Sequence, residues 1–184
     1  VNVTATGTAP NTIAANALTV SGGASNGSST SATLTVTPPL SVAKTFTPNV
    51  IARSATSLLT ITLTNPNAFD VTGVAFADTY PTNLLNTGTP NATSNCAAGI
   101  LTAVANGNLL TLTGGTVTGN SSCTVTVNVT SATGGVYNNN SGNITTTNAG
   151  TTTGAVGTLT VMAPPTVAKA FTPSSISIGG VSTL

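Results

Sequence analysis

The chain of 184 residues carries three Lys or Arg, two Asp or Glu and no His, so it offers few groups for acid–base catalysis. Zinc sites usually need about four Cys, His or carboxylate ligands, and calcium sites need several carboxylates, which two cysteines and two aspartates do not supply. Nucleic-acid binding needs a basic surface, which is absent. We therefore expect no enzyme activity, no cofactor, no metal and no nucleic-acid partner.

The rest of the composition favours strands. Hydrophobic residues make up 39% of the chain and fall in alternating runs, and Thr and Val suit a pleated sheet. Turns are favoured by Gly, Asn, Pro and Ser, which are common in the chain, whereas strong helix formers are scarce. No apolar run approaches the ~20 residues of a membrane helix. The composition predicts a folded all-β protein with no membrane span in this segment.

Alternation of apolar and polar residues predicts a series of short strands. In chain order they are Val42–Phe46, Leu59–Leu63, Val74–Phe76, Ile100–Val104, Leu109–Leu112, Cys123–Val129, Ile144–Thr146 and Val156–Val161. Asn106 and Gly107, between the fourth and fifth, are a strong signal for a hairpin turn. Short strands at this spacing predict an Ig-like antiparallel β-sandwich.

The chain also contains an internal repeat of about 126 residues. Pro38–Pro48 recurs as Pro164–Pro173, and Val1–Thr4 recurs as Val127–Thr130. The repeat divides the chain into the C-terminal part of one copy at 1–37, a complete Ig-like copy at 38–163, and the start of another at 164–184.

The junctions between copies are marked by two proline pairs, Pro38 with Pro39 and Pro164 with Pro165. Proline stiffens a connection and cannot donate to a sheet ladder. Val1–Thr4 reads as the middle of a strand, and residues 180–184 read as the beginning of one. We therefore expect a section of a longer tandem array, in which neighbouring copies of the same repeat are the partners that complete the partial ones.

Four segments in order resemble a known bacterial family: Val42–Pro48, Leu59–Asn67, Val74–Pro81 and Ser122–Thr130. They are similar to conserved-repeat, Ig-like domains of unknown function that occur in tandem in very long secreted and surface proteins. The resemblance implies an Ig-like fold, an extracellular or bacterial cell-surface location and no catalytic activity. It supplies no ligand.

Cys96 and Cys123 are the two cysteines of the chain. They could form a redox or metal pair, but an even count in a charge-poor, apparently secreted domain favours a structural disulfide. Closing a loop of this size stabilises the fold by roughly 3–4 kcal/mol on the chain-entropy model. Such a bond implies an oxidising compartment.

Lys44 is notable because the chain has so few charges and because it recurs as Lys169. In a strand with a period of two, Lys44 shares a face with Val42 and Phe46. If those two side chains are buried, Lys44 also points inward, and a buried lysine needs a partner.

The carboxylates available to Lys44 are Asp70 and Asp78. One hypothesis is a buried ion pair. A second is a spontaneous Lys–Asn isopeptide cross-link assisted by an aspartate, of the kind found in some other bacterial Ig-like stalks. The alternative is that Ala43 and Thr45 face inward and Lys44 is solvated.

The leading functional interpretation is a structural module of a long extracellular fibre, sheath or stalk that self-associates along and between repeats. Low charge suits this role because neutral surfaces do not repel one another. The alternatives are an adhesin or other binding module, including an ice-binding Thr-rich face, and a pilin-like subunit that polymerises by strand exchange. The Thr-x-Thr segments 60–64, 111–113 and 124–126 are more often simply the solvent side of a sheet.

Overall fold

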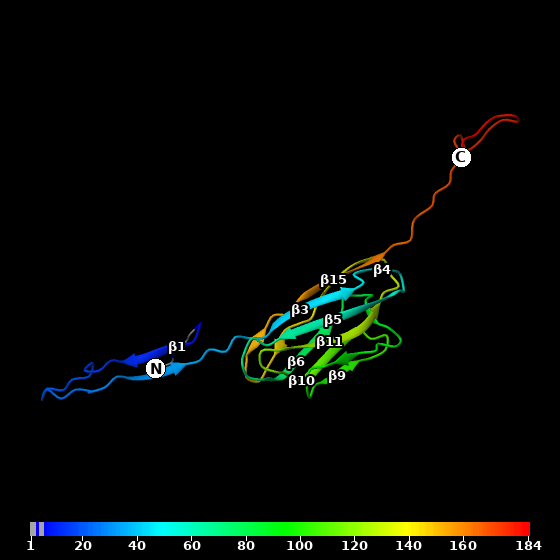
Figure 1. Cartoon of the computed structure of the whole chain (residues 1–184). Coiled ribbons are helices and arrows are strands. Elements are labelled where there is room, and N and C mark those ends of the chain that lie inside the picture. The colour runs from blue at the N-terminus through cyan, green and yellow to red at the C-terminus, as the bar shows by residue number, and fades with distance from the viewer. Residues whose placement is uncertain (1–2, 4–5) are drawn as a thin grey trace.

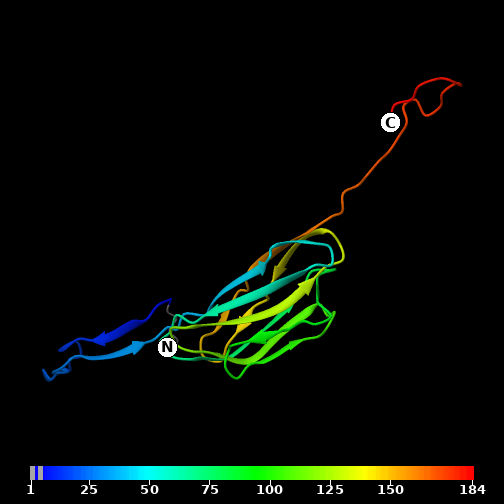
Figure 2. The same cartoon turned by 45° about the vertical axis from the view of Figure 1, so that its right-hand side comes forward.

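The computed structural model describes residue 3 and residues 6–184, and its strands form a β-sandwich with a flanking segment at each end (Figure 1). The two flanks leave the sandwich in opposite directions, which Figure 2 shows from a second angle. The described residues contain strands, turns and loops but no helix, so they include none that could cross a membrane.

One layer of the sandwich has the strand order β3-β5-β11-β7, and β8 also pairs with β11. The strands are β3 (Ser41–Thr47), β5 (Thr56–Thr64), β11 (Ser122–Thr130), β7 (Leu85–Asn86) and β8 (Thr93–Ser94). All pairings are antiparallel. In β5, Leu59, Ile61 and Leu63 are completely buried, so one face of the layer forms core.

The opposite layer has the order β14-β13-β6-β10-β9, also antiparallel. The strands are β14 (Thr151–Thr152), β13 (Ile144–Thr145), β6 (Val71–Thr79), β10 (Leu109–Val117) and β9 (Ile100–Ala103). The β9–β10 turn contains Asn106 with φ of 57°, a left-handed conformation that asparagine tolerates. The hairpin predicted at Asn106 and Gly107 is therefore confirmed.

A third, smaller sheet has the order β12-β15-β4, and its strands are β12 (Gly135–Asn140), β15 (Val156–Met162) and β4 (Val50–Ala52). β12 and β15 are antiparallel, whereas β15 and β4 are parallel. β15 lies beside β3 and β12 lies beside β6, so this sheet bridges the two layers along one side.

The three sheets enclose a single apolar core. Its largest fully buried side chains include Leu40, Leu59, Ile61, Leu63, Leu84, Leu110, Leu112, Ile144 and Leu159. Every layer contributes, and the core confirms the predicted all-β, Ig-like antiparallel β-sandwich. The alternation pattern predicts none of β4, β7, β8, β12 and β14, because these strands are short or rich in Asn and Thr.

The flanks contain little structure of their own. β1 (Ala9–Ile13) and β2 (Thr30–Leu34) form an antiparallel hairpin in which every residue is exposed. The strand predicted at Val1–Thr4 lies, apart from residue 3, outside the described residues. Residues 180–184 form no strand; an isolated bridge joins Thr172 to Thr183. The strands of the sandwich run from Ser41 to Met162, and the division into repeats stays a prediction.

Candidate functional site: a buried Lys–Asp–Asn cluster

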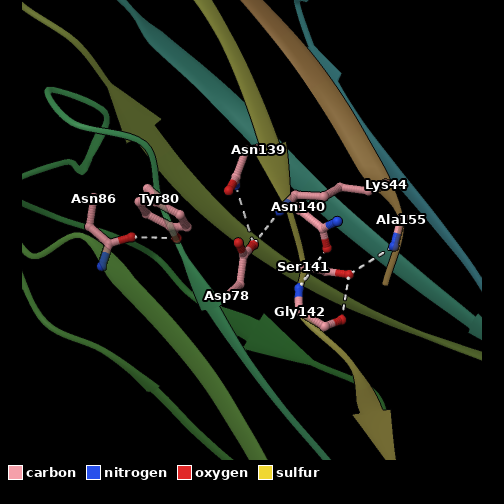
Figure 3. Close-up of polar contacts among 9 residues, drawn as sticks. All are labelled: Lys44, Asp78, Tyr80, Asn86, Asn139, Asn140, Ser141, Gly142 and Ala155. Atoms are coloured by element: carbon pink, nitrogen blue, oxygen red, sulfur yellow. Dashed lines mark hydrogen bonds and ion pairs between the residues drawn. The ribbon is translucent and has the colours of Figure 1, made fainter. Parts of the chain in front are cut away.

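Three polar side chains, Lys44, Asp78 and Asn139, meet inside the core, and each comes from a different sheet (Figure 3). Lys44 lies on β3, Asp78 on β6 and Asn139 on β12. The position where β15 meets β3 and β12 meets β6 brings these three strands together. The cluster therefore depends on the bridging sheet as much as on the two main layers.

The direction of Lys44 follows from the alternation of β3. Lys44 and Phe46 are buried, whereas Ala43 and Thr45 are exposed. Val42 is partly buried and packs against the core. The structure thus places Lys44 on the inward face, the arrangement that a period of two indicates.

One oxygen of Asp78 contacts both other members of the cluster. Lys44 Nζ donates to Asp78 Oδ2 at 2.5 Å, and both side chains have no exposed surface. Asn139 Nδ2 donates to the same Oδ2 at 3.4 Å, and Asn139 is also completely buried. The amine of Lys44 and the amide of Asn139 therefore converge on a single carboxylate oxygen.

Two oxygens of the cluster have no hydrogen-bond partner among the described residues. They are Asp78 Oδ1 and Asn139 Oδ1. A buried polar atom without a partner costs about 1–3 kcal/mol, so native structures seldom keep one without a reason. These two atoms distinguish the cluster from an ordinary buried ion pair.

Burial controls the protonation of the pair. Desolvation lowers the pKa of Lys44 and raises the pKa of Asp78, and in each case it outweighs the attraction between the two groups. Both shifts favour the uncharged forms, a neutral amine and a neutral carboxylic acid. A neutral lysine amine is a nucleophile, whereas an ammonium group is not.

The polar neighbours of the cluster are themselves satisfied. The Tyr80 hydroxyl donates to Asn86 Oδ1 at 2.8 Å, and Asn86 Nδ2 donates to the carbonyls of Val104 and Leu109 at 2.9 and 3.1 Å. Burial, and to a smaller extent the charge of Asp78, raises the pKa of Tyr80, so this phenol stays neutral. Tyr80 and Asn86 form a separate structural unit.

A glycine on β15 makes room for the lysine. Gly157 pairs with Asn139 across the β12–β15 ladder. A Cβ atom on Gly157 would lie 3.2 Å from Cγ of Lys44 and 3.1 Å from Cε2 of Phe46. The aliphatic part of Lys44 therefore packs directly over the backbone of Gly157 on its way to the cluster.

The other charged residues lie elsewhere. Asp70 is exposed and its Oδ1 accepts from the Gly119 amide at 3.0 Å, so the structure does not bring it to Lys44. Lys169 is exposed in the C-terminal flank. The described residues contain no group of three or more His, Cys, Asp or Glu that could hold a metal.

Cys96 and Cys123 form a disulfide, and both are buried. Cys96 follows β8 and Cys123 lies at the start of β11, so the bond fastens the loop between β8 and β9 to the first layer. The structure leaves no free cysteine among the described residues. This pair contributes to the scaffold and lies outside the Lys–Asp–Asn cluster.

The proline pairs lie in segments without regular structure. Pro38 and Pro39 precede β3, and Pro164 and Pro165 follow β15; all four are exposed. The carbonyl of Pro38 accepts from Asn67 Nδ2 at 3.1 Å, which ties this end of the segment to the sandwich.

Asn139 is the member of the cluster that sequence reasoning misses. Three consecutive asparagines, at 138–140, have low strand propensity, so the pattern predicts no strand there. The available signal is the period of two: Tyr137 and Asn139 are buried, and the residues between and after them are exposed. The inward position of an amide becomes visible only once Tyr137 is recognised as a core residue.

A family model described as "Domain of unknown function (DUF7933)" matches residues 39–161. No curated protein gives a match. Among solved structures, a non-cellulosomal cohesin from the archaeon Archaeoglobus fulgidus is 9% identical, covering 68% of this chain and 91% of that chain with a TM-score of 0.49. The bacterial hydrophobin BslA is 19% identical, covering 71% and 98%, with a TM-score of 0.48. The collagen adhesin of S. aureus is 11% identical, covering 74% and 54%, with a TM-score of 0.44.

Proposed function

The chain belongs to the family of domains of unknown function DUF7933, and we propose that its sandwich is a structural repeat of a long extracellular bacterial fibre, sheath or stalk. In this proposal the repeats follow one another in a single polypeptide, and neighbouring copies associate along and between chains. The domain acts as a spacer, without enzyme activity.

The observation that carries the proposal is the pairing of the N-terminal hairpin. β1 and β2 form an antiparallel hairpin, as β12 and β15 do at the end of the complete repeat. Leu34, the last residue of β2, begins a Leu-Thr-Val segment that recurs as Leu159–Val161 in β15. The N-terminal flank therefore has the antiparallel hairpin expected of the end of a preceding copy.

The chemistry of the surface and of the cysteines supports the same role. Charged residues make up 3% of the chain, so modules packed side by side would meet little electrostatic repulsion. The buried disulfide suits an oxidising environment outside the cytoplasm. The ionisable cluster is completely buried, so it cannot reach a diffusing substrate.

Denaturing electrophoresis of native material under reducing conditions tests the tandem arrangement. A covalent array runs as a very large polypeptide, because its repeats are joined through the backbone. A subunit band near 17.7 kDa would contradict it and would favour separate subunits that exchange strands across each junction.

A further inference from the structure

We propose that Lys44 and Asn139 become joined by an intramolecular isopeptide bond, and that Asp78 is the catalytic acid–base group that promotes it. The structure shows the arrangement of the reactants. This inference concerns the chemistry within one repeat, so it holds or fails independently of the role proposed for the array.

The geometry supplies the first argument. Asp78 Oδ2 lies 2.5 Å from Lys44 Nζ and 3.4 Å from Asn139 Nδ2, so one oxygen touches both the nucleophile and the leaving group. Such a shared contact replaces an encounter in solution with a fixed arrangement, which can greatly accelerate a reaction.

Burial supplies the second argument. None of the three side chains is in contact with solvent, so water does not compete for the amide or hydrate the amine. Desolvation lowers the pKa of Lys44 and raises the pKa of Asp78, which shifts the proton from the amine to the carboxyl group. The same environment thus prepares a free amine and a proton donor.

The unpartnered oxygens supply the third argument. A structural ion pair needs no asparagine beside it, and a structural asparagine would normally have its carbonyl satisfied. Here Asn139 Oδ1 and Asp78 Oδ1 are both buried and unpartnered. The cluster therefore carries the cost of two unsatisfied buried oxygens, which a purely structural role does not explain.

The chemical step balances without an external reagent. The lone pair of neutral Lys44 Nζ attacks Cγ of Asn139, and an Nζ–Cγ bond forms. The Asp78 carboxylic acid gives its proton to Nδ2 as the Cγ–Nδ2 bond breaks, and the resulting carboxylate takes a proton from Nζ. The products are a secondary amide and one ammonia, with nothing oxidised or reduced, and Asp78 ends in its original protonation state.

The start of the following copy holds a matching lysine. In the C-terminal flank, Lys169 occupies the position of Lys44 within the repeated Val-Ala-Lys segment. This is the arrangement expected if each repeat forms its own bond.

Intact mass and tryptic digestion of the reduced, denatured chain test the bond directly. We expect a mass lower by that of one ammonia. Trypsin has three cleavage sites, after Lys44, Arg53 and Lys169, and it does not cleave after an acylated lysine. We therefore expect cleavage after Arg53 and Lys169 but not after Lys44, and a branched peptide that joins residues 1–53 to residues 54–169.

Matched variants assign the partners. Asn139→Ala and Lys44→Met should each retain the ammonia, and Asp78→Ala should fail to form the bond although both partners are present. Asn138→Ala changes an exposed asparagine on the same strand, and Lys169→Met changes an exposed lysine; both should lose ammonia as the native chain does.

Two results would overturn the proposal. One is a native chain of full mass that trypsin cleaves after Lys44 as completely as after Lys169. The other is an ammonia loss that persists in Asn139→Ala, because it would then arise elsewhere, for example from a cyclic imide at Asn106 and Gly107. The mass of the native chain decides the first outcome even if a variant does not fold.

Discussion

Asn139 and Gly157 face each other across the β12–β15 ladder, and the space that Gly157 leaves by having no side chain is taken by the stem of Lys44. The absence of a side chain on one strand thus allows a lysine from a second strand to approach an asparagine on a third. The cluster is an arrangement of four positions, although three of them carry its polar groups.

Replacing Gly157 should therefore hinder the reaction without removing a reactant. In Gly157→Val, Cβ alone would lie 3.2 Å from Cγ of Lys44, and the two added methyl groups would displace the stem further. We expect a smaller cross-linked fraction, measured as the proportion of chains that have lost ammonia. Thr158→Val, on the exposed side of β15, is the control. Complete cross-linking in Gly157→Val would show that the glycine has no positioning role.

Removing the cross-link should lower the stability of the sandwich. The bond would close a loop from residue 44 to residue 139, and a closed loop of this length restricts the unfolded chain by about 4–5 kcal/mol on the chain-entropy model. Guanidinium chloride denaturation of Asn139→Ala should show this loss relative to Asn138→Ala. If both variants unfold at the same denaturant concentration, no such loop exists in the native chain.

The ionisation of Asp78 should make the free energy of unfolding depend on pH once Lys44 and Asn139 are both replaced. Burial raises the pKa of Asp78 above its ordinary value of 3.8, so the folded state holds its proton more tightly than the unfolded state. The resulting stabilisation is complete below pH 3.8 and is lost as the pH rises through the folded-state pKa. Lys44→Met/Asn139→Ala should therefore be more stable in acid than at neutral pH.

Denaturation midpoints measured between about pH 3 and pH 8 would follow this change. The triple variant that also carries Asp78→Asn is the control, because an amide in that position does not titrate and its profile should be flatter. Equal pH profiles for the two variants would mean that water reaches Asp78 and that its ionisation costs nothing in the folded state.

The disulfide should make a separate contribution. Cys96 and Cys123 are 27 residues apart, and opening a loop of this size should cost roughly 3–4 kcal/mol. Cys96→Ser/Cys123→Ser should lower the free energy of unfolding by this amount in chemical denaturation, while the loss of ammonia is unchanged. A variant that no longer cross-links would show that the disulfide is needed to assemble the cluster.

The fold and two candidate members of the cluster can be inferred from the sequence. Long alternating strands indicate which residues share a face, so Lys44 is expected to point inward if Phe46 is buried. Asp78 is then a candidate partner of Lys44 because the chain has only two carboxylate side chains, although the sequence does not distinguish Asp78 from Asp70. Only the pairing of β6 with β10 and β13 places Asp78 inside the sandwich and leaves Asp70 at the edge.

Asn139 and Gly157 could not be identified in the same way. Asn139 lies in a strand that pairs with β15 and whose sequence is weakly strand-forming, so tertiary contacts decide its structure. The role of Gly157 depends on the close approach of β3, and this approach cannot be inferred from the residues around Gly157 in the sequence. The roles of both residues depend on contacts between strands that are distant along the chain.

Lys44 lies in the middle of the first strand of the sandwich, and Asn139 lies on the strand that pairs with the last. With the isopeptide bond in place, a pull on the two ends of the repeat would pass from β3 directly into β12. Residues 45–138, including the whole disulfide loop, would bear no tension. A fibre built from such repeats would resist stretching through covalent bonds rather than through the hydrogen bonds between its strands.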